Sequence, residues 1–152
     1  MDLRAATEPA PGSASNEDAV FVAGELVGVL DGVSAPAGVP TGCVHTTEWY
    51  VQRLVVHLAS AQNEMPAAAL SDLLGAAIQA TRGDHGGVCD LSHPGTHAAA
   101  VCLLRANGRQ ADYLILCDVT LALDYGDKVE TVTDERFGAA VADLRTLAFS
   151  GA

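Results

Sequence analysis

The sequence has few basic residues. Only eight of its 152 residues are lysine or arginine, Lys128 is the sole lysine, and the formal net charge is −11. Nucleic acids and anionic membrane surfaces are bound through basic patches, so this composition argues against nucleic acid and against a membrane as partners. It fits a soluble protein that holds divalent cations.

Membrane-spanning runs and cysteine pairs are also missing. No apolar run approaches the length that crosses a bilayer, and residues 5–15 are rich in Pro, Ala and Ser without the apolar core of a signal peptide. The four cysteines, Cys43, Cys89, Cys102 and Cys117, form no CxxC pair, and three of the four lie in or beside apolar runs. We therefore expect reduced, buried thiols in a cytoplasmic protein.

A globular core is well supported, because 49% of the residues are hydrophobic. We expect a flexible lead over residues 1–15 and a single domain over 16–152. Two short apolar runs, 19–22 and 26–30, are separated by Gly24 and Glu25 and predict a β-hairpin.

The remaining elements follow from periodicity and turn residues. Helical spacing predicts helices near 46–59, with Thr46 or Thr47 as N-cap, and near 66–81, with Pro66 in the first turn. Residues 82–94 read as a polar loop. Strands are expected at 98–105, 113–118, 120–123 and 129–133, with a closing helix at 136–147. Runs of strands around paired helices favour a layered α+β domain over alternating βαβ units.

The predicted first hairpin brings Asp18 and Asp31 to the same end. Two carboxylates at one end of a buried sheet repel each other unless a cation or a proton lies between them. Asp31 is followed by Gly32, and carboxylate and carbonyl oxygens suit Mg²⁺ or Mn²⁺. On the residue types alone, a simple turn at Asp31–Gly32 is the favoured alternative, because Asp-Gly is a common turn pair.

Three stretches, taken in order, resemble the PPM-type metal-dependent protein phosphatases, the protein phosphatase 2C family. NEDAVF followed by VGVLDGVS resembles the opening hairpin of the family. Pro94-Gly95-Thr96 before AAAVCLLR resembles its glycine–threonine motif, and LILCDVTLALDYGDKVETVTDERF resembles a later strand–aspartate–strand region. The resemblance implies an αββα sandwich, two Mg²⁺ or Mn²⁺ ions, and hydrolysis of phosphomonoesters by metal-activated water. A phosphorylated protein or a small phosphoester would be the substrate.

The resemblance also implies roles for individual residues. Asp31 would bridge the two metals and Gly32 would offer its backbone carbonyl. Asp18 would act mainly through metal-bound water, with Glu17 beside it, so that Asp18 and Asp31 are the catalytic pair. Asp118 would help to hold a weaker third metal.

Several family features are replaced or not found. Ser13 stands where the family carries a phosphate-binding arginine, and Cys117 and Val119 flank Asp118 in place of glycine and serine. The family has further metal-binding aspartates later in its sequence, and after Phe137 this sequence contains only one aspartate, Asp143. The alternative is therefore a truncated or degenerate, non-catalytic module that binds a partner or a metal. Sheet edges exposed by a truncation would favour a homodimer.

A second cluster of potential ligands lies further along the chain and comprises Asp84, His85, Cys89, Asp90, His93 and His97. Its irregular spacing and single thiol favour a polar loop near the active face over a zinc site. His93 or His97 would, by the resemblance, be placed to assist a leaving group. Cys43 and His45 could form a nucleophilic pair, but a packed cysteine is the favoured reading.

Overall fold

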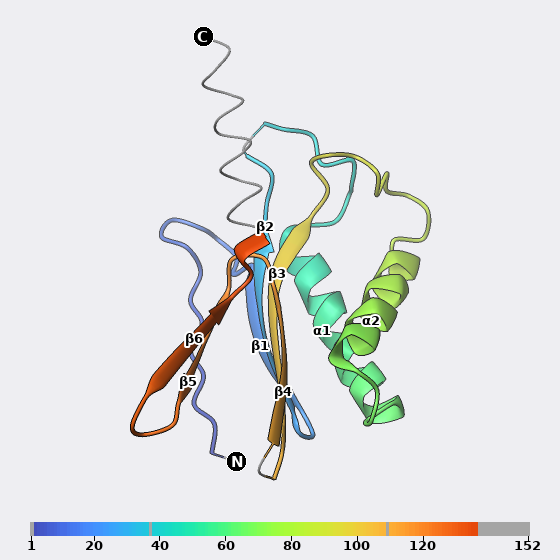
Figure 1. Cartoon of the computed structure of the whole chain (residues 1–152). Helices are drawn as coiled ribbons and strands as arrows, with labels where there is room; N and C mark the ends of the chain where they lie inside the picture. Colours follow the sequence, from blue (N-terminus) through green and yellow to red (C-terminus); the bar gives the residue numbers. More distant parts are fainter. Residues whose placement is uncertain (1, 37, 109, 137–152) are drawn as a thin grey trace.

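The computed structural model describes residues 2–36, 38–108 and 110–136. A first hairpin of β1 (Asp18–Ala23) and β2 (Leu26–Val33) is followed by two helices, α1 (Thr47–Glu64) and α2 (Leu70–Asp84). Four strands follow: β3 (Ala98–Asn107), β4 (Gln110–Leu116), β5 (Thr120–Asp124) and β6 (Val129–Thr133). The helices lie on one side of the sheet and the β5–β6 hairpin lies on the other, so the α+β layered class is confirmed (Figure 1).

The main sheet is antiparallel throughout, in the order β1-β2-β3-β4. Gly24 makes the turn between β1 and β2 with a φ of +61°, a conformation that glycine adopts without steric cost. After the two helices the chain returns to pair β3 with β2, so the opening hairpin is held on both sides of β2. A separate two-stranded sheet contains β5 and β6.

The core fills the space between the sheet and the helices. Strand β2 alternates strictly, with Leu26 and Leu30 buried and Val29 and Asp31 exposed on the other face. Burying a leucine side chain contributes about 1.5–3 kcal/mol, so this alternation fixes which residues of the hairpin face away from the helices. The fully buried large side chains are Leu26, Leu30, Leu54, Leu58, Leu73, Leu103, Val51 and Val101.

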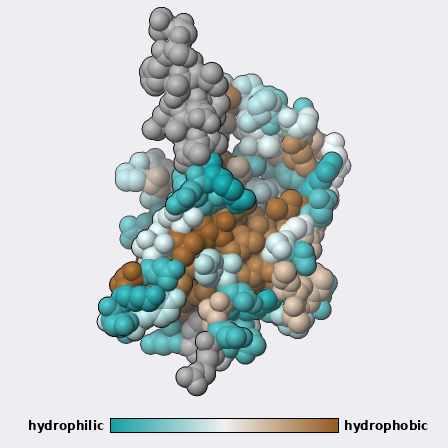
Figure 2. Space-filling model, viewed as in Figure 1, coloured by the Kyte–Doolittle hydropathy of each residue, from teal (hydrophilic) through white to brown (hydrophobic). Residues whose placement is uncertain are grey.

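The other face of the sheet is also apolar. One row of cross-strand neighbours runs from Val20 through Val29 and Cys102 to Ile115. In Figure 2 apolar side chains gather over the sheet beside the hydrophilic β5–β6 hairpin, and Val29 remains 42% exposed. Homodimerisation through exposed parts of the sheet stays a prediction.

The predicted first hairpin is confirmed, the later expected strands form two more hairpins, and the first helix begins as expected. The hydroxyl of Thr46 accepts a hydrogen bond from the amide of Trp49 and caps α1, which continues to Glu64. The second helix begins at Leu70, so the prediction that Pro66 opens it is wrong. Arg105 on β3 donates hydrogen bonds to the carbonyls of Pro66 (3.0 Å) and Ala68 (2.7 Å), which holds this segment as a turn.

The remaining boundaries can be settled only in part. Residues 82–84 belong to α2, so the polar loop starts at His85 rather than at Arg82. The predicted closing helix, 136–147, lies outside the described residues except for Arg136. Residues 2–17 contain no helix or strand. Within the described part of the chain, no helix is long and apolar enough to cross a membrane.

Candidate metal centre

Asp18 and Asp31 are direct cross-strand partners at one end of the opening hairpin. Asp31 lies inside β2, with Gly32 and Val33 continuing the strand, so the interpretation of Asp31–Gly32 as a turn is wrong. The register brings the two carboxyl groups to the same end of the sheet, where their negative charges repel each other. A divalent cation between them would relieve this repulsion.

Other acidic residues add to the negative charge at this end. Burial raises the pKa of Asp31 above its usual value of 3.8, and Asp18 raises it further through its charge and its hydrogen bond. The charges of Asp118 and Glu17 act in the same direction. The charges of three other carboxylates therefore act on Asp31, and oxygen donors under mutual repulsion fit a hard divalent cation such as Mg²⁺ or Mn²⁺.

Gly32 allows helix α1 to pack directly against this end of the sheet. Its amide donates a hydrogen bond to the carbonyl oxygen of Glu17 at 3.2 Å. A Cβ atom added at position 32 would overlap that oxygen and would lie 2.8 Å from Thr47 Cγ2 and 2.9 Å from Val51 Cγ2. Position 32 therefore requires glycine, because the backbone of Glu17 and two side chains of α1 leave no room for a Cβ atom.

Asp118 is positioned by an unusual backbone at its neighbour. Cys117 has a φ of +67°, in the left-handed region that favours glycine, and this explains why the resembling family motif has glycine at that position. Nearby, Arg136 donates hydrogen bonds of 2.8 and 2.9 Å to Asp134 and lowers the pKa of that carboxyl to about 2. The charge of Arg136 also acts on the Cys117 thiol, which places a cation near the acidic end.

A chain of hydrogen bonds leads from the acidic end into the loops. Ser34 Oγ donates to Glu17 Oε1 at 2.6 Å and lies 2.7 Å from Thr47 Oγ1. Thr47 Oγ1 lies 2.7 Å from His97 Nδ1, and His97 Nε2 donates to the carbonyl oxygen of His45 at 2.8 Å. Thr47 is 1% exposed, so the middle of this chain is shielded from water.

Each of the two hydroxyls can accept one hydrogen bond and donate another. Ser34, Thr47 and His97 therefore form a continuous hydrogen-bonded path between Glu17 and the carbonyl of His45, and we call this path the relay.

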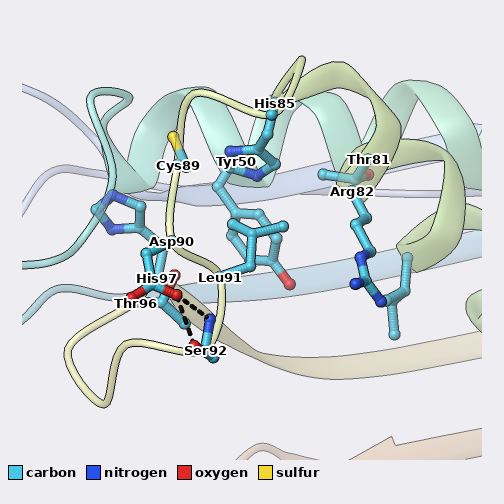
Figure 3. Close-up of a pocket in the computed structure, with 12 residues that line it drawn as sticks. Tyr50, Thr81, Arg82, His85, Cys89, Asp90, Leu91, Ser92, Thr96 and His97 are labelled. Atoms are coloured by element: carbon cyan, nitrogen blue, oxygen red, sulfur yellow. Dashed lines mark hydrogen bonds between the residues drawn. The ribbon is translucent and has the colours of Figure 1, made fainter.

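The predicted second cluster divides in the structure. Asp84 accepts a hydrogen bond from His57 Nε2 at 2.8 Å and pairs with Arg53 at 3.3 Å, which ties α1 to α2. Asp90 accepts hydrogen bonds from the amide and hydroxyl of Ser92 (Figure 3). Neither carboxylate contributes to a group of three or more potential metal ligands among the described residues.

Cys89 and His85 both contact Cys43. Cys43 was not part of the cluster predicted from the sequence. One ligand atom from each of these three residues lies within 4.8 Å of the other two. Among the described residues, no other group of three or more potential metal ligands is this close together. Burial lowers the pKa of His85, and the nearby His45 and His97 lower it further, so the neutral imidazole is favoured. The two thiols belong to segments that are 46 residues apart, and no local spacing signals their contact.

A pocket of about 720 Å³ adjoins this thiol group. Its lining includes Tyr50, Arg82, His85, Cys89 and His97. Figure 3 shows Cys89 toward the left, Arg82 toward the right, and His85 between them beside Tyr50. His85 and Cys89 therefore border the pocket, and through His97 the pocket also reaches the relay.

The fold is similar to solved structures, although the sequence matches no known family. No protein-family model and no curated protein matches the sequence. Among solved structures, the PPM Ser-Thr phosphatase MsPP from Mycobacterium smegmatis, crystallised in complex with cacodylate, matches with a TM-score of 0.60 at 18% identity. The Mycobacterium tuberculosis serine/threonine phosphatase PstP/Ppp matches with a TM-score of 0.59 at 17% identity.

These matches cover most of this chain but only part of the neighbours. Each covers 85% of this chain, and they cover 51% of MsPP and 52% of PstP/Ppp. At this level of identity the likeness concerns the fold. The chain therefore has a PPM-like fold and spans about half of the length of these two neighbours.

Proposed function

We propose that the chain carries a metal-dependent phosphomonoester hydrolase site of the PPM type. The observation that carries this proposal is the direct cross-strand pairing of Asp18 and Asp31, on the opening hairpin of a PPM-like fold. Two Mg²⁺ or Mn²⁺ ions would be held by Asp18, Asp31 and the carbonyl of Gly32, with Asp118 close by. The proposed substrate is phosphoserine or phosphothreonine in a protein, or a small phosphoester.

The divalent ions would supply acidification of a water molecule and stabilisation of charge on the phosphate oxygens. The chain's own residues have separate tasks. Asp18 and Asp31 would hold the cations. The relay from Glu17 to His97 offers a hydrogen-bonded path along which a proton can pass between the acidic end and the histidine.

Arg136 is the proposed contact for the substrate phosphate. Position 13 is serine, and Arg136 supplies a cation near the acidic end, where its charge acts on Cys117 beside Asp118. Its side chain is 81% exposed, although Asp134 accepts two of its hydrogen bonds. Asp134 would orient the guanidinium, leaving Nη1 and the second N–H of Nη2 to bind phosphate oxygens.

A non-catalytic module is the second candidate. The chain spans about half of the length of its structural neighbours, and its acidic end offers one direct carboxylate pair. Affinity for hard cations grows with the number of charged ligands, so a site with few carboxylates binds its ions weakly. Such a module would bind metal or a partner without turning over substrate.

One experiment separates the two candidates. Mn²⁺ is titrated into wild type, Asp31→Asn and the control Asp72→Asn by calorimetry, and hydrolysis of p-nitrophenyl phosphate is measured in parallel. Asp72 lies in the first turn of α2, so the control makes the same chemical change on a different element. Binding and turnover that both require Asp31 support the hydrolase, and Asp31-dependent binding without turnover supports the module. Binding that is indifferent to Asp31 contradicts the hydrolase and also a module that binds metal at the acidic end.

A further inference from the structure

Three ligand atoms of the kind that zinc prefers meet between two loops and a helix end. Cys43 Sγ lies 2.7 Å from Cys89 Sγ and 3.4 Å from His85 Nδ1. Cys43 comes from the loop between β2 and α1, His85 is the C-cap of α2, and Cys89 comes from the loop before β3. Two thiols and an imidazole from three separate segments are more specific than any of these residues alone.

Backbone amides are already aimed at both sulfur atoms. The amide of His45 donates to Cys43 Sγ at 3.4 Å, and the amide of Val44 donates to Cys89 Sγ at 3.4 Å. Hydrogen bonds to sulfur favour the thiolate, which is the form that binds metal. One short backbone segment therefore supports both ligands from outside the ligand group.

Aromatic packing fixes the third ligand. His85 is 5% exposed, and its ring meets the edges of Trp49 at 4.9 Å and His45 at 5.3 Å between centroids. Trp49 and His45 are themselves stacked at 3.8 Å. The imidazole is thus held in place before any ligand arrives, as the outer shell of a metal site requires.

We propose that Cys43, His85 and Cys89 form a zinc site. Tetrahedral zinc lies about 2.3 Å from sulfur and about 2.0–2.1 Å from nitrogen, which places two sulfurs roughly 3.7 Å apart and a sulfur and a nitrogen roughly 3.6 Å apart. The sulfur–nitrogen separation already fits, and the sulfurs need to separate by about 1 Å. Both cysteines are in loops, where such an adjustment is tolerated.

The fourth coordination position opens toward the pocket. His85 and Cys89 both line the pocket of about 720 Å³, so water or a small ligand can complete the tetrahedron. Thiolate and imidazole ligands select zinc over Mg²⁺ and Mn²⁺, whereas the carboxylates of Asp18 and Asp31 select the hard ions. The two sites therefore differ in the metal that they accept.

The test uses the full chain, reduced and handled without oxygen. Co²⁺ is titrated first, because thiolate ligands give a sulfur-to-cobalt charge-transfer absorption, and Zn²⁺ is then added to displace it. We expect one Co²⁺ per chain with this absorption in wild type, and its loss in Cys43→Ala and Cys89→Ala. The matched control is Cys102→Ala, which removes a half-buried thiol on β3 and retains the absorption.

Two further measurements keep the result clear. Far-UV circular dichroism of each variant checks that the loss of metal does not reflect loss of the fold, and Asp31→Asn is expected to keep its thiolate absorption. Failure of the phosphatase proposal therefore leaves this one standing, and the reverse holds as well. A reduced wild-type protein without charge-transfer absorption overturns the zinc site. A Cys43–Cys89 disulfide that forms in air, with no metal bound by the reduced protein, overturns it too.

Discussion

Gly32 offers a sharp test of how the acidic end is built. Replacing it with alanine adds one methyl group where the backbone of Glu17 and two side chains of α1 already lie in contact distance. Gly75, inside α2, is the matched control, because a Cβ added there meets nothing within 4 Å. Both variants remove the same glycine flexibility from the unfolded chain, so their difference isolates the close approach.

The expected size follows from the contacts. Contacts at 2.8 Å to Thr47 Cγ2 and 2.9 Å to Val51 Cγ2 are well inside the optimum of about 3.5–4.0 Å for carbon atoms. Overpacking of this kind costs about 1–3 kcal/mol. The oxygen of Glu17 can retreat only by giving up its hydrogen bond to Gly32, which adds about 0.5–1.5 kcal/mol. Gly75→Ala should instead gain about 0.5–1 kcal/mol from helix propensity.

Equilibrium unfolding in urea, followed by far-UV circular dichroism, measures both variants. Urea is uncharged and leaves the electrostatics of the acidic end unscreened, unlike guanidinium. We expect Gly32→Ala to lose about 2–4 kcal/mol of unfolding free energy with an unchanged slope. Wild-type stability in Gly32→Ala would refute the close approach of α1. An equal loss in Gly75→Ala would show that the loss is not specific to the close approach at position 32.

Three other predictions concern charge, proton transfer and backbone strain. The pKa of Asp31 is raised above 3.8 in the folded state, so the stability of the metal-free protein should fall as pH rises through that raised pKa. Thermal melts at several pH values should show this fall in wild type and not in Asp31→Asn. With Mn²⁺ at 100 times its Kd, wild type should gain about 2.7 kcal/mol and Asp31→Asn should not, so equal gains would contradict Asp31 as a ligand. Thr47→Val should cost about 1–3 kcal/mol by removing the buried Thr47 hydroxyl that pairs with His97 Nδ1, and should alter the pH dependence of phosphoester hydrolysis. An unchanged pH profile would argue against the relay. Cys117→Gly should gain about 0.5–1 kcal/mol in urea unfolding, because left-handed backbone costs about 1–2 kcal/mol for a non-glycine residue and glycine's own flexibility offsets part of that. A loss of stability would show that the Cys117 side chain contributes more than its strain removes.

The hairpins could be predicted because their signals are local. Gly24 and Asn107–Gly108 mark turns whose geometry then fixes the register, and the register places Asp18 opposite Asp31 without any knowledge of the rest of the fold. The acidic pair was therefore predictable from a stretch of fewer than twenty residues. The start of α2 was not, because Arg105, far along the chain, binds the carbonyls that would otherwise enter a first helical turn.

The thiol group shows the opposite case. Cys43 and Cys89 touch because two loops meet beside the end of α2, and no spacing rule connects residues that are so far apart in sequence. The relay could not be predicted for the same reason. Ser34 lies in the loop after β2, Thr47 is the first residue of α1, and His97 lies in the loop just before β3. Local chemistry predicts what one hairpin brings together, and only the tertiary fold predicts what loops bring together.

The stacking of His45 on Trp49 gives the protein an intrinsic optical reporter. Trp49 is the sole tryptophan of the chain, so its emission comes from one place, beside His85 and beneath the guanidinium of Arg53. A charged imidazole quenches a stacked indole by electron transfer, whereas a neutral one quenches it less. Any event that moves the segment from Cys43 to His45, or changes the charge on its histidine, should therefore be readable as a change in fluorescence intensity without a label.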